Sequence, residues 1–417
     1  MKNFLFAIRI AAYSLRNEVK AIISDGGALL ILFGASIVYP VAYSVAYKNE
    51  VIHELPVAFV DLDKTLSSRT ISRMIDATEK TKVNIKPGSL TEAEELFWEG
   101  KVNGVILIPE GFEKNIVKGT SATISVYCDA SHFLMYKETL ASTLAVSSTY
   151  GAGVEITRLM SSGSSREQAM MQRDPLQAKF RMLYNPVGSY GGYVMPGILL
   201  IILQQALLVG IGMISGASRE KKDHIIPGLR FGNTALPIII GRSLAYFGVA
   251  LITSSFMLLW VYNWFGFPSK SGYFNVFVLL IPYIFATIFM GFTISFLFRK
   301  REQSIMFLVF LSPIVLFMSG ISWPKTSMPA IINLISSILP SSFMVPAYLR
   351  VRTMGVPLTD VTHELTVLCL QTLIYCILAV TLYYFMRQGQ AKKSADKKEL
   401  SQSNQNETIQ TDQKEIT

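Results

Sequence analysis

The stretch GYVMPGILLIILQQALLVGIGMISGA, residues 192–217, decides the fold of this chain. It holds no charged residue, and it is longer than the roughly 20 apolar residues that a helix needs to cross the hydrocarbon core of a bilayer. The whole chain has 417 residues, of which 51% are hydrophobic and only 16% are charged. An average soluble protein has about 25% charged residues. Residues 192–217 therefore predict a transmembrane helix in a membrane protein.

Five further segments have the same character, and with the first they predict a multi-pass α-helical membrane protein with six transmembrane helices. Arg242 is the only charged residue within the six segments. It lies near one end of its helix, from where a long side chain can snorkel to the membrane interface. The five segments are roughly 26–47, 237–262, 273–298, 304–323 and 366–386.

The apolar stretch 329–349 is interrupted by prolines. Proline breaks a helix because it lacks a backbone N–H and its ring clashes with the preceding turn. We therefore expect a re-entrant or interfacial hairpin here and no seventh straight span. The prolines are Pro329, Pro340 and Pro346.

Basic residues beside the apolar segments indicate the orientation, because Lys and Arg are enriched in cytoplasmic loops. They gather before the first segment, between the second and third, between the fourth and fifth, and after the last. Both termini are therefore expected in the cytoplasm, with the chain in the cell inner membrane and the long insert at 48–188 outside. This topology accounts for the net charge of +9, so no nucleic-acid partner is expected.

Residues 1–25 predict a cytoplasmic amphipathic helix that lies in the inner-leaflet interface before the chain enters its first span. Basic and apolar side chains fall on opposite faces of this helix, although a merely basic leader remains an alternative. The basic residues are Lys2, Arg9, Arg16 and Lys20, and the apolar ones are Phe4, Ile8, Leu15 and Val19.

The insert at 48–188 alternates strand and helix patterns, which predicts an extracytoplasmic α/β domain with a small parallel or mixed sheet. Thr91, with Glu94 three residues later, is the expected N-cap of one helix. Strands are expected at 56–63, 83–86, 103–109, 122–129 and about 177–184, and helices at 67–77, 91–100, 111–119, 132–160 and through Met170. Residues 387–417 are rich in Lys, Gln, Asn, Glu and Ser, so a disordered cytoplasmic tail is expected.

Asp61 and Asp63, directly after the strand VAFV, resemble the acidic pair of haloacid-dehalogenase phosphatases. Such an enzyme also needs a second acidic pair after a later strand, and the insert has none. We therefore interpret the two aspartates as caps of a turn and of the following helix. A membrane-anchored phosphohydrolase stays open as an unlikely alternative.

No GxxxxGK[ST] phosphate-binding motif, catalytic triad or metal-ligand spacing occurs in the chain. The sequence therefore predicts that this chain is not an enzyme and binds no cofactor. If the protein carries out an energy-requiring process, the energy must come from a partner. The short, charged loop at 218–237 is of the kind that docks on a partner and transmits its motion.

Three stretches together resemble the type-2 ABC transporter permeases, in the subgroup with a large extracytoplasmic domain between spans one and two. They are RMLYNPVGSYGGYVMPGILLIILQQALLVGIGMISGASREK (181–221), Ile240-Gly241-Arg242, and FMSGISWPKTSMPAIINLISSILPSSFMVPAYL (317–349). The resemblance covers nearly the whole chain except the C-terminal tail. One departure is Lys222-Asp223-His224, where relatives have Gly-Thr and an acidic residue.

The resemblance implies a permease subunit of an ABC exporter for a hydrophobic or amphipathic substrate, driven by a separate ABC ATPase subunit that binds ATP and magnesium. It also implies a homodimer or a related second permease, and suggests a periplasmic adaptor protein. A non-transporting scaffold or surface receptor is the alternative. The implied ATPase-coupling residues are Arg219, Glu220, Lys221, Lys222 and Arg242. The implied outer hairpin, 324–360 with its approach, carries Ser319, Gly320, Pro324, Met328, Pro329 and Pro340.

Overall fold

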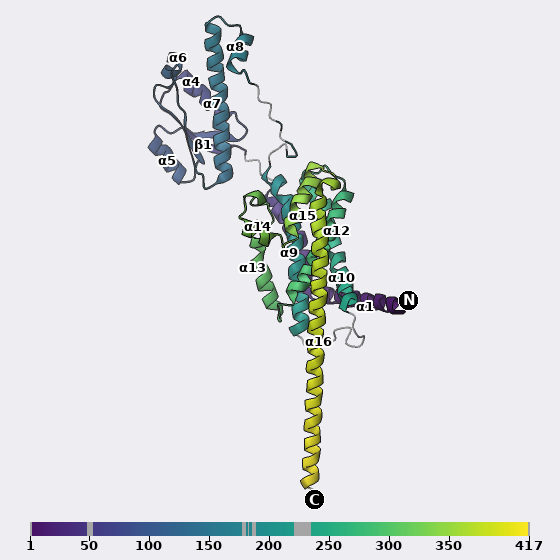
Figure 1. Ribbon diagram of the computed structural model, residues 1–417. Coiled ribbons are helices and arrows are strands. Elements are labelled where there is room, and N and C mark those ends of the chain that lie inside the picture. Colours follow the sequence, from purple (N-terminus) through teal and green to yellow (C-terminus); the bar gives the residue numbers. More distant parts are fainter. Residues whose placement is uncertain are drawn as a thin grey trace. The chain divides into compact units, whose positions relative to one another are not determined.

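The computed structural model describes residues 2–47, 53–176, 181, 183–185, 189–220 and 235–415. The chain divides into two compact units (Figure 1). The helical unit consists of Met1–Lys48 and Met182–Thr417, and the sheet unit consists of Asn49–Arg181.

Six helical segments among the described residues are long and apolar enough to cross a membrane, as the sequence predicts. The first, Gly26–Ala46, consists of α2 (Gly26–Leu29), the π-helical η1 (Leu30–Ala35) and α3 (Ser36–Ala46). The third, Ala235–Phe265, consists of α10 (Ala235–Ser255), η2 (Phe256–Val261) and α11 (Tyr262–Phe265). The others are α9 (Tyr190–Glu220), α12 (Tyr273–Ser295), α13 (Arg301–Met318) and the segment Leu358–Gln388, in which η5 (Leu358–Val361) leads into α16 (Thr362–Glu415).

Helix α9 lies at the centre of the helical unit, where it packs against α3, α12, α13 and α15 (Ser341–Tyr348). Small residues permit this packing. A Cβ atom at Gly212 would overlap the hydroxyl of Ser304 on α13, and one at Gly216 would lie 2.9 Å from the carbonyl oxygen of Lys300. Close backbone approach at small residues is the usual way in which membrane helices associate, because lipid supplies no hydrophobic force between them.

The N-terminal helix α1 (Lys2–Ser24) packs on α10. Its buried stripe holds Ile10, Ser14, Glu18 and Ile22, spaced four residues apart. Phe4, Ile8 and Val19, on the apolar face expected from the sequence, are exposed in the isolated chain. The helix therefore has a third, buried face of two isoleucines, a serine and a glutamate, which the division into basic and apolar faces does not show.

Residues 329–349 form a bent helix pair, as their prolines predict. Helix α14 (Ala330–Ser336) and the apolar segment Ser341–Met354 differ in direction by 91°. The second segment consists of α15 and the π-helical η4 (Leu349–Met354). A short 3-10 turn, η3 (Lys325–Ser327), precedes the pair.

The expectation of a disordered tail at 387–417 is wrong for the described part of that segment. Helix α16 continues without a break to Glu415, and Figure 1 shows it extending beyond the other helices of its unit. The membrane span has already nucleated this helix, so the tail needs only to propagate it. The tail contains no proline and many Ala, Lys, Gln and Glu residues, which have high helix propensity.

The sheet unit contains a four-stranded mixed sheet in the order β2-β1-β3-β4. Strand β1 (Leu55–Asp61) pairs in parallel with β2 (Thr81–Ile85) and β3 (Gly104–Ile108), and β4 (Ser125–Cys128) runs antiparallel to β3. These four strands correspond to the first four predicted ones. The predicted strand at 177–184 falls largely outside the described residues, and its described members, 181, 183 and 184, are not in a strand.

Helices cover both faces of this sheet. Val57 and Phe59 of β1 pack with Ile71 of α4 (Leu66–Asp76) and Val146 of α7 (Phe133–Ser161). Ala58 and Val60 point to the other face, beside Ala93 of α5 (Leu90–Trp98). The remaining helices are α6 (Phe112–Lys118) and α8 (Arg166–Arg173).

The N-cap of α5 is Ser89, so the prediction of Thr91 is wrong. The Ser89 side chain accepts a hydrogen bond of 3.2 Å from the backbone N–H of Glu92. Both residues are good capping types, and the period of the apolar residues does not fix the first turn to within two residues.

Candidate functional site

A cluster of charged residues, which contains two ion pairs, joins α1 and the start of the first span to other transmembrane helices at one end of the helical unit. Its members are Glu18 and Asp25 near the end of α1, Arg219 at the end of α9, Arg242 in the second turn of α10 and Arg301 at the start of α13. We call these five residues the anchor cluster. They surround the ends of the helices that flank the basic loop at 221–234, which itself lies outside the described residues.

Glu18 and Arg242 form the buried centre of the cluster. Arg242 donates two parallel hydrogen bonds, Nε to Oε2 at 2.8 Å and Nη2 to Oε1 at 2.9 Å. The Tyr246 hydroxyl donates to the same carboxylate at 2.9 Å, and the guanidinium lies over the ring of Phe292. The two charged side chains are only 10% and 19% exposed, so neither reaches bulk water freely. A bidentate pair with further hydrogen bonds is the geometry in which burial of two opposite charges is tolerated.

The structure gives the Arg242 guanidinium a counter-charge on α1, the carboxylate of Glu18. A paired partner of this kind is what a charged side chain within a membrane span requires.

Asp25 and Arg301 make the second pair. Arg301 Nη1 donates to Oδ2 at 2.8 Å and Nη2 donates to Oδ1 at 2.9 Å. Asp25 is also the N-cap of α2, since its Oδ1 accepts from the backbone N–H groups of Gly27 and Ala28 at 3.1 and 2.9 Å. One carboxylate therefore both starts the first span and ties it to the fifth.

Arg219 joins α9 to the turn after α12. Its guanidinium donates to the carbonyl oxygens of Ser295 and Phe298 and lies over the Phe296 ring. These carbonyls belong to the end of a helix, where backbone acceptors have no intrahelical partner. Of the other implied coupling residues, Glu220 ends α9, while Lys221 and Lys222 lie outside the described residues.

Gly241 permits α1 and α10 to approach this closely. A Cβ atom at 241 would overlap the carbonyl oxygen of Ala11 and would lie 2.9 Å from the Ser14 Cβ. Because Gly241 has no side chain, the backbones of α1 and α10 can touch at this position. Arg242, the next residue, then lies opposite Glu18.

The residues implied for the outer hairpin mark the ends of its elements. Gly320, with a φ of +89°, follows the end of α13, which is why the fifth span stops before the predicted residue 323. Pro324, Pro329 and Pro340 precede η3, α14 and α15 at their N-cap positions, and Met328 follows η3. The Ser319 hydroxyl is buried and donates to the Leu316 carbonyl. In the described part of the chain, these residues do not come together in one site.

The hairpin is joined to the spans by two buried amides. Gln204 of α9 donates to the Ser341 hydroxyl at 3.2 Å and accepts from the Ser341 N–H at 3.0 Å. Gln371 of α16 donates to the Ser337 carbonyl at 2.8 Å. These bonds satisfy the backbone groups that a bend leaves free, which is the condition for non-helical backbone at membrane depth.

This architecture is that of a known membrane family. A family model described as ABC-2 family transporter protein matches residues 27–381. The chain belongs to the ABC-2 family. No curated protein matches the chain. The match starts at the first span and ends within the last, so it includes both the anchor cluster from α9 onward and the hairpin.

Asp61, the last residue of β1, and Asp63, two residues later, have structural roles in this ABC-2 permease. Asp61 accepts from the Lys64 N–H and the Ser68 hydroxyl, both at 2.8 Å. Asp63 accepts from the Thr65 hydroxyl at 2.7 Å and from the Glu113 N–H at 2.9 Å. Burial opposes ionisation of Asp63, but these hydrogen bonds outweigh it and lower its pKa below 3.8. Both residues cap turns and helices, as interpreted from the sequence, and no metal-binding group of His, Cys, Asp and Glu occurs among the described residues.

Glu18, Asp25 and Arg301 of the permease were not predicted as partners from the sequence. One signal was available: Glu18 and Asp25 are the only acidic residues before Glu50, in a segment that is otherwise basic. Acidic residues that interrupt a basic amphipathic helix indicate an internal partner for their charge.

Proposed function

We propose that this ABC-2 permease is the membrane subunit of an exporter that moves a hydrophobic or amphipathic substrate, with a separate ABC ATPase bound at the end of the helical unit that carries the anchor cluster. The ATPase would hold the ATP and magnesium, and this chain would hold neither.

The anchor cluster is the observation that carries the proposal. Arg242 links α10 to α1, Arg301 links α13 to the N-cap of α2, and Arg219 links α9 to the turn after α12. A partner that pushes on the loop at 221–234 or on α1 would therefore move several spans together. Rigid-body movement of packed elements is one of the general ways in which a protein transmits a conformational change.

The orientation follows from the basic residues at this end. Arg219, Arg299, Lys300 and Arg301 lie beside it, in or next to short loops, which supports a cytoplasmic location. Both termini would then be cytoplasmic in the inner membrane. The sheet unit, inserted between the first and second spans, would be extracytoplasmic, and the hairpin at 324–360 would cap the outer end of the pathway.

The content of the spans supports an apolar or amphipathic substrate. Most of the polar side chains buried in the described helical unit are neutral amides and hydroxyls, such as Gln204, Ser341 and Gln371; the charged exceptions are Glu18 in the anchor cluster and Arg352 at the end of the hairpin. The apolar window of each candidate span holds at most two charged residues, too few for the series of charged groups that ion or proton transport would need.

A second permease copy would complete the pathway. Apolar side chains of the first span and of α13 are exposed in the single chain, including Leu30, Val38 and Phe310. They offer a surface to a second copy or to lipid. A periplasmic adaptor is a further proposed partner.

Co-purification of an ATPase with the tagged permease tests the proposal. We expect Lys221→Glu/Lys222→Glu to weaken association while the permease keeps its own thermal stability. Cysteine labelling of intact cells at Lys118→Cys, in the sheet unit, should succeed with a membrane-impermeant reagent. An unlabelled sheet unit in intact cells, with labelling after lysis, would overturn the orientation and the exporter model with it.

A further inference from the structure

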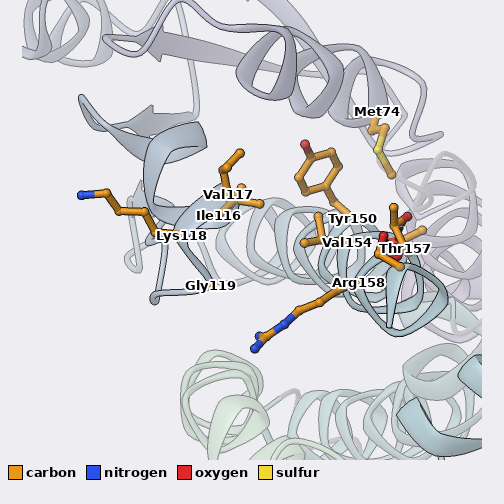
Figure 2. Close-up of a pocket in the computed structure, with 12 residues that line it drawn as sticks. Met74, Ile116, Val117, Lys118, Gly119, Tyr150, Val154, Thr157 and Arg158 are labelled. Atoms are coloured by element: carbon orange, nitrogen blue, oxygen red, sulfur yellow. Dashed lines mark hydrogen bonds between the residues drawn. The ribbon is translucent and has the colours of Figure 1, made fainter. Parts of the chain in front are cut away.

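The sheet unit contains an open groove outside the anchor cluster and the spans. It lies between α6 and the C-terminal half of α7, with Met74 of α4 at one end, and has a volume of about 800 Å³ (Figure 2). Ligand pockets for small molecules have volumes of roughly 300–1,000 Å³. The groove therefore matches a single small ligand better than a protein segment or a diacyl lipid.

The groove has an apolar centre. Ile116 and Val117 of α6 face Tyr150 and Val154 of α7, and Met74 closes the row. Val117 is 81% exposed, although its neighbour Ile116 packs on the hydrophobic core of the unit. Val117 therefore continues the apolar row from the half-buried Ile116 to the surface of the unit.

Two cations stand at the edge of this apolar centre. In Figure 2 the side chains of Lys118 and Arg158 extend outwards from the apolar side chains. No carboxylate lines the groove, and neither cation forms an ion pair with another described residue. The positive charge at the groove mouth is therefore not neutralised by the described chain.

The turn after α6 lies against Arg158. Gly119 ends α6 in the left-handed region, with a φ of +73°, so the helix stops directly after Lys118. A Cβ atom at 119 would lie 3.4 Å from Arg158 Nη1, which places the guanidinium against this turn. Thr149, Gly153 and Thr157, spaced four residues apart on α7, add small and polar residues to the lining of the groove.

We propose that this groove binds a single-chain anionic amphiphile, whose acyl chain lies on the row from Met74 to Val117 and whose carboxylate or phosphate head pairs with Lys118 and Arg158. Apolar surface supplies affinity for the chain, and charge-assisted hydrogen bonds select the anionic head. That this ligand is also the exported cargo rests on the proposed function; the binding itself does not.

Photo-crosslinking of the full chain in phosphatidylcholine nanodiscs tests the proposal. The probe is palmitic acid with a diazirine in its chain, and the comparison probe is the corresponding alcohol. Lys118→Glu/Arg158→Glu removes the cations of the groove. Lys114→Glu/Arg166→Glu makes the same change of net charge at exposed positions on α6 and α8 that do not line it. Val154→Trp, which fills the apolar centre, is an independent variant.

We expect the acid to label peptides that contain 116–119 and 149–161, and the alcohol to label them about tenfold less, equivalent to 1.4 kcal/mol. The groove reversal and Val154→Trp should each lower this labelling about tenfold, again about 1.4 kcal/mol, and the control reversal should leave it unchanged. Equal labelling by the alcohol, or equal loss in the control reversal, would overturn the proposal. So would loss of labelling when phosphatidylglycerol replaces phosphatidylcholine, because bilayer lipid would then be the ligand.

A second measurement separates this inference from the proposed function. If the permease fails to bind an ATPase but the groove is labelled as expected, the exporter model fails and the site stands. If the ATPase binds and palmitate labels only the helical unit, the site fails and the exporter model stands. Stimulation of ATP hydrolysis by palmitate in the assembled complex, lost in the groove reversal, would identify the ligand as cargo.

Discussion

Glu18 and Arg242 lie 224 residues apart in the chain and are joined by two hydrogen bonds of 2.8 and 2.9 Å. The pair fixes α1 to α10, and the Tyr246 hydroxyl completes the shell of the carboxylate. An amphipathic helix held only by lipid could slide or detach, whereas one held by a buried bidentate pair moves with the span that it contacts.

Removal of one partner of this pair should destabilise the permease strongly. In Glu18→Ala, Arg242 would keep its charge in a buried site without a counter-charge, a change that costs about 3–5 kcal/mol in buried pairs. We expect a clear fall in the temperature at which the detergent-solubilised protein aggregates. Arg16→Ala, an exposed position on the same helix, should change stability by no more than about 0.5 kcal/mol. A Glu18→Ala protein as stable as the wild type would show that the pair does not hold α1.

Gly241 should be intolerant of even one methyl group. In Gly241→Ala the new Cβ would overlap the Ala11 carbonyl oxygen, so α1 would have to shift away from α10. Overpacking of this kind costs about 1–3 kcal/mol. Gly248→Ala is the matched control, because no atom lies within 4 Å of a Cβ there on the same helix. We expect Gly241→Ala to melt earlier and to expose α1 to protease, and Gly248→Ala to do neither; identical behaviour of the two variants would contradict the close contact.

The elements that the sequence predicts well are those with long or strongly alternating patterns. Residues 192–217 form a long apolar run without charge, which predicts a membrane span, and the structure has the helix α9 at Tyr190–Glu220. In the insert, PVAFVDLD predicts β1 because its residues suit a buried strand, and the structure places Val57 and Phe59 in one core and Ala58 and Val60 in the other. The apolar pattern of such a helix or strand lies within one short segment of the chain, so a single sequence is enough to predict the element.

Partners across the fold could not be predicted in the same way. Arg242 is recognisable as an unusual charge in a span. The helical period of that span shows on which face Arg242 lies, but it does not show that Glu18 is its partner. The helical tail was missed for a different reason: its composition suits disorder as well as a helix, and only continuity with the span Leu358–Gln388 decides between them. The groove beside Lys118 and Arg158 depends on the turn at Gly119, which sequence patterns do not place against α7.

Asp63 should make the sheet unit sensitive to acid. Its pKa in the folded protein is lowered from 3.8 by hydrogen bonds that require the ionised carboxylate. The stabilisation is therefore complete above about pH 4 and is lost as the pH falls through the lowered folded value. Asp63→Asn should be less stable than the wild type by about 1 kcal/mol at pH 7, and this difference should shrink at pH 3.

Denaturant titrations of both proteins at pH 7, 5 and 3 measure the difference directly. Glu94→Gln, a change at an exposed carboxylate of α5, serves as the control and should show no such trend. A difference between wild type and Asp63→Asn that is the same at all three pH values would mean that the charge of Asp63 has no part in holding the turn.

Asp25 combines a helix cap with an ion pair, and variants can separate the two. Arg301→Met removes the pair but leaves the Asp25 carboxylate to accept from Gly27 and Ala28. Asp25→Asn keeps an acceptor for the cap and loses the charge, while Asp25→Ala loses both. Loss of a cap costs about 0.5–2 kcal/mol. The Arg301 side chain is 33% exposed, so the ion pair is partly screened and contributes about 1 kcal/mol or less.

We therefore expect Asp25→Ala to melt at the lowest temperature, and Asp25→Asn and Arg301→Met to lie together between it and the wild type. Ser24→Ala, one residue earlier and exposed, should match the wild type. The double variant Asp25→Ala/Arg301→Met should be no worse than Asp25→Ala, because the pair is already absent there. If Asp25→Asn were as unstable as Asp25→Ala, the charge would hold the first span and the cap would contribute little.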